Sequence, residues 1–344
     1  MPKNIVLCLD GTWNHKENPA LRTNVALLHD MCELDAYRQI TYYDTGVGTR
    51  NVWYDEQLGG VYGLGLSAKI RAAYAFLSQY YEHGDKVYLF GFSRGAFSVR
   101  SLSGLLYRCG LTKPLMEDAK ELMDLFNAYA WKDYPRMAEM KASNRYCPIE
   151  MIGVWDTVGA LGIPVSFLRR PSEVINSFHD TRLSPEVKQG RHALAVDERR
   201  AFFLPTLWHQ SPENKDRIKQ VWFAGVHADV GGGYRDRHHS DIPLKWMLGE
   251  ARKCGLLLKE EITYQFRPDL SQDIHKSVYK LFGNEVAVQK REAYISPNYT
   301  PKVHHSLIEK LYLRPDYKPV ALWKHLENRE TLAPYHVEYD TDLQ

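Results

Sequence analysis

A serine between two glycines, in the stretch VYLFGFSRGAFSVRSL from Val87 to Leu102, is the feature of this sequence that most directly indicates chemistry. The residues before it are apolar and β-rich, which predicts a buried strand, whereas the apolar residues after it recur with a helical period. Ser93 therefore falls on a strand-to-helix turn, where Gly91 and Gly95 supply the small residues that so sharp a turn requires. A serine alcohol on such a turn is typical of a nucleophile for acyl transfer, although a chance G-x-S-x-G would look the same in isolation.

A nucleophilic serine needs a base that accepts its proton and a carboxylate that orients the base. Asp156 directly follows the apolar run MIGVW, and His227 directly follows the run VWFAGV. With Ser93 they give the chain order serine, aspartate, histidine that G-x-S-x-G hydrolases use. The alternative for Asp156 is a helix N-cap, because Asp-Thr before a turn is a common cap.

Fourteen histidines compete for the role of the base. His227 comes first because it follows a strong strand pattern and precedes a glycine-rich loop. His304 is second, since a histidine that late in the chain can also reach back over the sheet. His192 and His209 are weaker candidates, because the first is expected to open a helix and the second to lie in a loop.

Strand-end aspartates offer an alternative chemistry. Asp229 can orient His227, although a carboxylate on the same loop more often braces that loop. Asp10 ends the first apolar run and is a secondary candidate, because hard cations take several carboxylates. A metal site of this kind would use Asp10, Asp44, Asp156 and Asp229. It would leave the serine turn unexplained, and we expect neither a metal nor a cofactor.

An acyl-transfer site also needs donors aimed at the developing oxyanion. One is expected from the backbone N–H of Arg94, the residue after the serine. The others are expected from Gly11 and Thr12, in the loop after the first apolar run, because a glycine lets the backbone turn its N–H groups inward.

Apolar runs that end in polar or ionisable residues predict the fold. The runs are Asn4–Leu9, Ile40–Tyr43, Val87–Phe90, Ile149–Trp155 and Ile218–Val226. They are too uniformly apolar for a sheet with one exposed face, and helical stretches separate them, so they predict a mostly parallel sheet flanked by helices. The chemistry of such sheets gathers at the carboxyl ends of the strands. The segment His192–Trp208 is expected to be a helix ended by a Phe-Phe-Leu-Pro turn.

The chain, with 344 residues of which 44% are hydrophobic, is long enough for one large α/β domain with additions. We expect a core at residues 1–256, a helical insertion at 111–147 and a C-terminal extension at 257–344 that packs on the core. The insertion is expected either to cap the site or to pack on the flank of the sheet. Either Leu111–Tyr146 or the aromatic loop Val52–Tyr62 can supply an apolar rim over Ser93.

Composition excludes several classes of protein. With 44 basic and 42 acidic residues, the chain carries no electrostatic footprint for nucleic acid. The five cysteines are scattered and form no C-x-x-C, which favours a reducing compartment over a disulfide framework or a zinc site. Neither a signal peptide nor an apolar span of roughly 20 residues is recognisable, so we expect a cytoplasmic protein, with export by a dedicated secretion system as an open alternative. The sequence does not predict an oligomeric state.

Six blocks of the sequence resemble an α/β-hydrolase family that includes the first class of type VI secretion lipase effectors, with bacterial and fungal proteins of unassigned role. The blocks are LCLDGTWN, YYDTGVGT, HGDKVYLFGFSRGAFSVR, GVWDTVGALG, HALAVDERRAFFLPTLW and VWFAGVHADVGGGY, within residues 4 to about 260 and in the family's order. The resemblance implies an α/β-hydrolase fold and an esterase acting on acyl lipids, with phospholipase A activity in characterised members. It implies the triad Ser93, Asp156 and His227.

The expected partners are a lipid or small-molecule ester and, transiently, a membrane surface. Two alternatives to a lipid hydrolase stay open. One is a small-molecule esterase with the same triad. The other is a non-catalytic or metal-dependent α/β binding protein that has kept the scaffold, for which the strand-end aspartates are the support.

Overall fold

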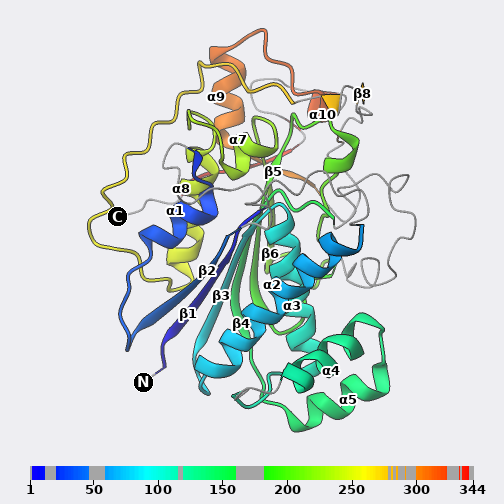
Figure 1. The fold of residues 1–344 in the computed structure, drawn as a ribbon. Coiled ribbons are helices and arrows are strands. Elements are labelled where there is room, and N and C mark those ends of the chain that lie inside the picture. Colours follow the sequence, from blue (N-terminus) through cyan, green and yellow to red (C-terminus); the bar gives the residue numbers. More distant parts are fainter. Residues whose placement is uncertain are drawn as a thin grey trace.

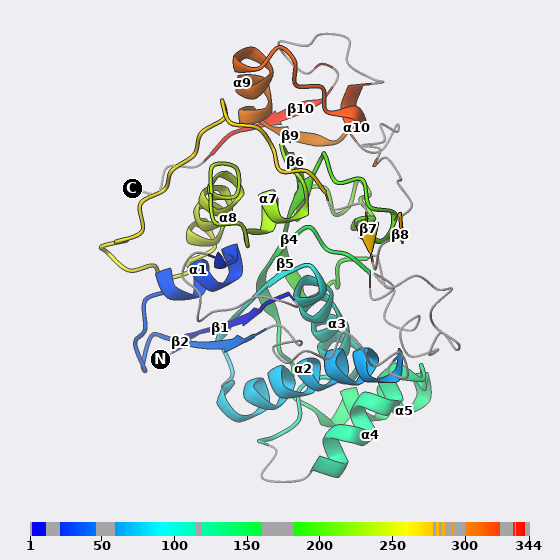
Figure 2. The same ribbon diagram turned by 45° about the horizontal axis from the view of Figure 1, so that its top comes forward.

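The computed structural model describes residues 2–11, 21–45, 59–114, 119–159, 182–277, 280–281, 284–285, 291, 300–323, 333 and 335–340. Its centre is an eight-stranded sheet in the order β10-β9-β6-β5-β4-β3-β1-β2, in which all paired strands are parallel (Figures 1 and 2). The strands are β1 (Asn4–Leu9), β2 (Gln39–Asp44), β3 (Lys86–Phe92), β4 (Ile149–Trp155), β5 (Val187–Ala195), β6 (Ile218–Phe223), β9 (Lys302–His304) and β10 (His336–Glu338). A short antiparallel pair, β7 (Lys280–Leu281) and β8 (Asn284–Glu285), is separate. The predicted α/β-hydrolase-like fold is confirmed.

Helices cover both faces of the sheet, because the strands are apolar on both sides. In β1, Leu7 and Leu9 pack into one core with α2 (Gly59–Tyr80) and α3 (Arg94–Cys109). The alternate residues Val6 and Cys8 pack into a second core with α1 (Asn24–Met31) and α8 (Asp241–Lys253). Figure 1 shows these two helix pairs on opposite sides of the strands. None of the helices in the described part of the chain is long and apolar enough to cross a bilayer.

The helix predicted over His192–Trp208 is wrong. Residues Val187–Ala195 form β5, an inner strand paired with β4 on one side and β6 on the other. Only Ala201–Phe203 is helical, as one 3-10 turn. Alanine and leucine favour a helix locally, but burial between two strands overrides that preference.

The helical insertion packs on the flank of the sheet. Its helices α4 (Ala119–Ala130) and α5 (Tyr134–Ser143) join the C-terminal end of α3 to the start of β4, and both of those points lie at the amino edge. Paired backbone hydrogen bonds between Leu111 and Arg145 close its base, at 2.8 and 2.9 Å. The side chains of Leu125 and Phe126 are buried in the core beside α2 and α3. In Figure 1 the pair lies at the end of the sheet opposite α7 (His227–Gly231), so it does not cap Ser93.

The last part of the chain extends the main sheet. β9 pairs with β6, and β10 pairs with β9. The helices α9 (His305–Leu313) and α10 (Val320–Trp323) cover this edge with a third apolar cluster that includes Leu307 and Leu322 (Figure 2).

In the predicted rim Val52–Tyr62, residues 52–58 lie outside the described residues, and α2 begins at Gly59.

Because the serine turn is closely packed, we expect a single methyl group added there to destabilise the protein. A Cβ at Gly95 would overlap the backbone carbonyl of Leu9, the last residue of β1, which is fixed between β2 and β3. We expect Gly95→Ala to lower the free energy of unfolding by about 3 kcal/mol, measured by urea denaturation. Gly104→Ala is the control on the same helix, because its Cβ would meet the end of the Tyr129 side chain rather than backbone. Equal stability of Gly95→Ala and the wild type would contradict this packing.

Candidate active site at the carboxyl edge of the sheet

Ser93 lies on the turn between β3 and α3 with a strained backbone. Its φ of 58° and ψ of −120° fall in a region that residues with a side chain rarely adopt. Its backbone N–H donates to the carbonyl of Trp155 at 3.1 Å, which fixes the turn against the end of β4. A Cβ at Gly91 would lie 2.6 Å from the backbone of Gly95, so both glycines are required for the strand and helix to meet this closely. Ser93 occupies the N-cap of α3, but its hydroxyl makes no capping hydrogen bond.

Asp156 and His227 meet at the same edge. Asp156 follows β4 and has a positive φ of 39°, and its N–H donates to the carbonyl of Ala193 at 2.7 Å. His227 is the first residue of α7, after β6. Its Nδ1 lies 2.5 Å from Oδ2 of Asp156. Because the carboxylate holds Nδ1 in a hydrogen bond, the Nε2 atom is left to exchange a proton with another group.

The Asp156 carboxylate is fully buried and compensated by Arg291. The guanidinium Nη1 donates to Oδ1 at 2.6 Å, and Nη2 donates to Oδ2 at 2.9 Å. The backbone N–H of Ala195 also donates to Oδ1, at 3.0 Å. Burial acts to raise the pKa of Asp156, but Arg291 and the hydrogen bond from His227 outweigh it and hold the pKa below its usual value. The group is therefore a carboxylate at any working pH.

Aromatic rings enclose the His227 imidazole. Phe92 lies 4.6 Å from it between ring centroids, and Phe203 meets it edge-on at 4.7 Å. Burial lowers the pKa of His227 and outweighs the raising effect of Asp156, so the ring is neutral at pH 7, as a general base must be. Among contacts between described residues, no hydrogen bond joins the ring to the Ser93 hydroxyl. Such bonds are often long in the absence of substrate and tighten in the complex.

The expected oxyanion donors differ in their surroundings. Arg94 is the first residue of α3, so its N–H belongs to a helix N-terminus, which favours negative charge. The N–H of Gly11 instead donates to Oδ1 of Asp10 at 2.7 Å. The sequence did not indicate this bond, which forms because the Asp10 carboxylate turns back on its own loop. Thr12 lies outside the described residues.

Each strand-end aspartate has separate partners. Asp10 accepts hydrogen bonds from the hydroxyls of Thr23 and Tyr43 at 2.5 and 2.7 Å. Asp44 pairs with Lys69 at 3.0 Å. Asp229 binds Nδ1 of His275 at 2.6 Å and the N–H of Val226 at 3.0 Å, and so braces the start of α7. The described residues Asp10, Asp44, Asp156 and Asp229 do not converge on a common ion position.

The rival histidines have other contacts. His192 is buried in β5, where its Nε2 accepts the N–H of Thr157 at 3.1 Å, and burial lowers its pKa to about 3. His209 is exposed. His304 ends β9 and contacts Ser306 and Asp340.

Two residues near the triad candidates were not found from the sequence. Glu198 accepts the backbone N–H of His227 at 3.2 Å and is itself held by Arg200 at 2.8 Å. Its position just after β5 was hidden by the incorrect helix prediction. Arg291 carries no local signal, because it lies far along the chain in a stretch without a motif.

A family model and a yeast protein match the sequence of this chain. A family model described as "T6SS, Phospholipase effector Tle1-like, catalytic domain" matches residues 3–250. An uncharacterized protein of Saccharomyces cerevisiae is 32% identical over 231 residues, which cover 58% of this chain and 32% of that protein. The chain thus spans about a third of the length of this relative.

Two solved structures are similar at low sequence identity. One is the Tle1 effector bound to the VgrG spike of the type 6 secretion system, with 18% identity, a TM-score of 0.42 and coverage of 68% of this chain and 51% of that chain. The other is an uncharacterized protein from Pseudomonas aeruginosa, with 20% identity, a TM-score of 0.47 and coverage of 75% and 46%. The family model covers well over half of the chain, and the resemblance found in the sequence is thereby confirmed: the chain belongs to the Tle1-like phospholipase effector family, by the catalytic domain of that family.

Proposed function

We propose that this protein is a serine hydrolase of the lipase or phospholipase type, which cleaves carboxylic esters of lipids. Ser93 is the nucleophile, His227 the base and Asp156 the carboxylate that orients it. The observation that carries the proposal is the 2.5 Å hydrogen bond between Asp156 and His227, at the edge of the sheet where Ser93 occupies a strained turn. Membership of the Tle1-like family supports a lipid ester as the substrate.

The proposed reaction has two steps. The Ser93 hydroxyl attacks the ester carbonyl while Nε2 of His227 takes its proton, and the N–H of Arg94 stabilises the oxyanion. The alcohol leaves with that proton, and the acyl group stays on Ser93. Water then attacks the acyl-enzyme and gives a proton to His227, which passes that proton to Oγ of Ser93 as the bond to the acyl group breaks and the acid leaves. Asp156 stays ionised throughout and stabilises the imidazolium that forms in each step.

The first test of this function is the nucleophile. We expect Ser93→Ala to fold like the wild type and to lose activity by about four orders of magnitude or more, as removal of a triad member does. Activity is measured on p-nitrophenyl esters, and covalent labelling by a fluorophosphonate is measured in parallel. Ser103→Ala, on the same helix, is the control and should keep both. Near wild-type hydrolysis by Ser93→Ala would show that the serine turn has another role.

A second test concerns Arg291, which we infer to be a positioning residue. His227 acts as a base only when neutral, so its lowered pKa places the acid limb of kcat/KM below pH 6.5. Without the guanidinium, the Asp156 charge interacts more strongly with the imidazolium, and the pKa of His227 rises. We therefore expect Arg291→Gln to move the acid limb to higher pH by about one unit. The variant should also be destabilised by about 3 kcal/mol, because a buried charge loses its partner.

The pH profile of kcat/KM distinguishes a positioning role of Arg291 from a purely stabilising one. Arg136→Gln, which removes an exposed arginine on α5, is the control. It should change neither the acid limb of kcat/KM nor the free energy of unfolding. If Arg291→Gln lost stability but kept the wild-type limb, Arg291 would be a structural residue only.

A third test concerns the substrate class. We expect activity on phospholipids to rise when the substrate passes from monomers to vesicles, because a lipid hydrolase must meet its substrate at an apolar surface. The measurement compares short p-nitrophenyl esters with phosphatidylcholine below and above its aggregation concentration, with Ser93→Ala as the blank. Efficient cleavage of soluble esters without a gain on vesicles would identify a small-molecule esterase. Absence of both hydrolysis and fluorophosphonate labelling would favour a non-catalytic protein.

A further inference from the structure

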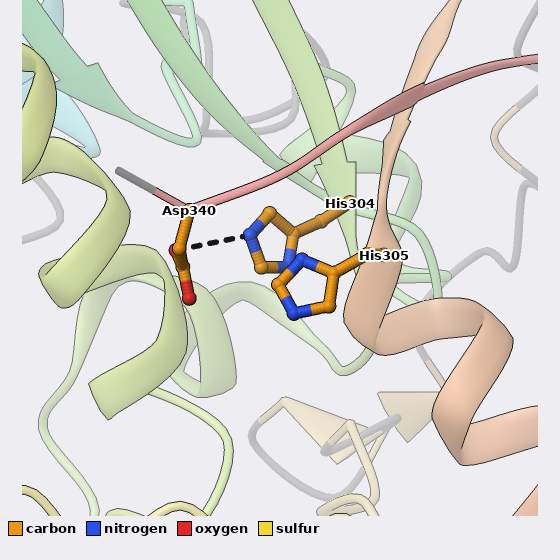
Figure 3. A group of neighbouring side chains, drawn as sticks. All are labelled: His304, His305 and Asp340. Carbon is orange, nitrogen blue, oxygen red and sulfur yellow. Dashed lines mark hydrogen bonds and ion pairs between the residues drawn. The ribbon is translucent and has the colours of Figure 1, made fainter. Parts of the chain in front are cut away.

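Three side chains that the proposed reaction does not use come together at the carboxyl end of β9. His304 ends β9, His305 begins α9, and Asp340 lies two residues after β10. Each offers one possible metal-ligand atom, and these atoms lie within 4.8 Å of one another. All three residues fall outside the family match to residues 3–250. Figure 3 shows both rings and the carboxylate turned toward the same space.

Hydrogen bonds within the protein satisfy both ring nitrogens of only one of the two histidines. The Nε2 atom of His304 lies 3.2 Å from Oδ1 of Asp340, and its Nδ1 lies 2.9 Å from the hydroxyl of Ser306. His304 is thus satisfied without any ligand. His305 is not, because its Nδ1 is buried without a hydrogen-bond partner. Buried polar atoms are usually paired, and this nitrogen has no partner among the residues that the structure describes, so it is free to bind a ligand.

We propose that His304, His305 and Asp340 bind a divalent transition-metal ion, with Zn²⁺ as the best match. Two imidazoles and one carboxylate are ligands that zinc takes in proteins, and water would complete the tetrahedron. His304 binds through Nε2 and His305 through Nδ1. Ligands of one zinc ion lie roughly 3.4 Å apart, so atoms at the 4.8 Å limit have to approach by about 1.4 Å.

An oxygen atom lies near the second ring nitrogen of each histidine. Such a histidine donates its other N–H to an oxygen, which fixes the ring and its tautomer. For His304 the Ser306 hydroxyl lies 2.9 Å from Nδ1, but Nδ1 also accepts the backbone N–H of Ser306 at 3.4 Å, so a metal on Nε2 requires the other tautomer of this ring. For His305 the Glu309 carboxylate can take this role only after it moves closer, because its Oε1 lies 3.8 Å from Nε2. The side chains of His305 and Asp340 are partly exposed, which leaves the ion a path from solvent.

The ion would fasten the end of the chain to the sheet. β10 is an edge strand of three residues that pairs only with β9 among the described strands. A metal bound by Asp340 and by the β9–α9 junction would link β10 to its neighbour a second time. The site is therefore structural, and it is distinct from the strand ends that carry Ser93 and Asp156.

The experiment uses the full chain, treated with a chelator and titrated with Zn²⁺ against a chromogenic competitor. We expect one equivalent of Zn²⁺ to bind to the wild type. Binding to His305→Gln and to Asp340→Asn should be weaker by about tenfold or more, because each variant removes one ligand. His83→Gln is the matched control, since His83 is exposed near the amino edge, and it should bind like the wild type. Circular dichroism checks that the variants are folded.

Hydrogen exchange gives a second readout that does not depend on activity. Zn²⁺ should slow amide exchange at residues 336–340 in the wild type and in His83→Gln, and leave it unchanged in the two ligand variants. If the wild type bound no Zn²⁺, or bound it no better than His305→Gln and Asp340→Asn, the proposal would be overturned. Zn²⁺ binding that left exchange at residues 336–340 unchanged would overturn the structural role.

Discussion

The buried negative charge of Asp156 is the constraint on which the arrangement of the candidate site depends. An unpaired carboxylate in a protein interior is too costly to persist, so its position requires partners from other parts of the chain. Arg291 supplies two hydrogen bonds, His227 supplies one, and the backbone of Ala195 supplies another. The ends of β4, β5 and β6 and a residue from the last fifth of the chain are therefore held at one point.

The parallel sheet explains why one edge carries all of these groups. Because neighbouring strands run in the same direction, the residues that follow β3, β4 and β6 emerge at the same edge, and helices cover both faces of the sheet. The turn at Ser93 then depends on backbone contact between Gly95 and β1, which no residue with a side chain allows. The conformational strain at Ser93 and Asp156 is sustained by this close packing.

Sequence patterns located the strands that lead into the candidate site because those strands are long, apolar and followed by polar residues. They failed for β5, where alanine and leucine in HALA favour a helix and only the neighbouring strands impose an extended backbone. They also failed for β9 and β10, which are too short to show a periodicity. The sequence did not decide where the predicted insertion lies, because the position of α4 and α5 depends on which edge of the sheet the end of α3 and the start of β4 meet.

The sequence by itself determined the family, the mostly parallel sheet and the candidates Ser93, Asp156 and His227, because each follows a recognisable apolar run in the order that the chemistry requires. Only the tertiary structure decided which charges surround them. The pairing of Asp156 with Arg291 spans 135 positions, and the group of His304, His305 and Asp340 joins residues up to 36 positions apart. Contacts of this kind leave no periodic pattern along the chain, because they depend on where strands and loops come to lie in space.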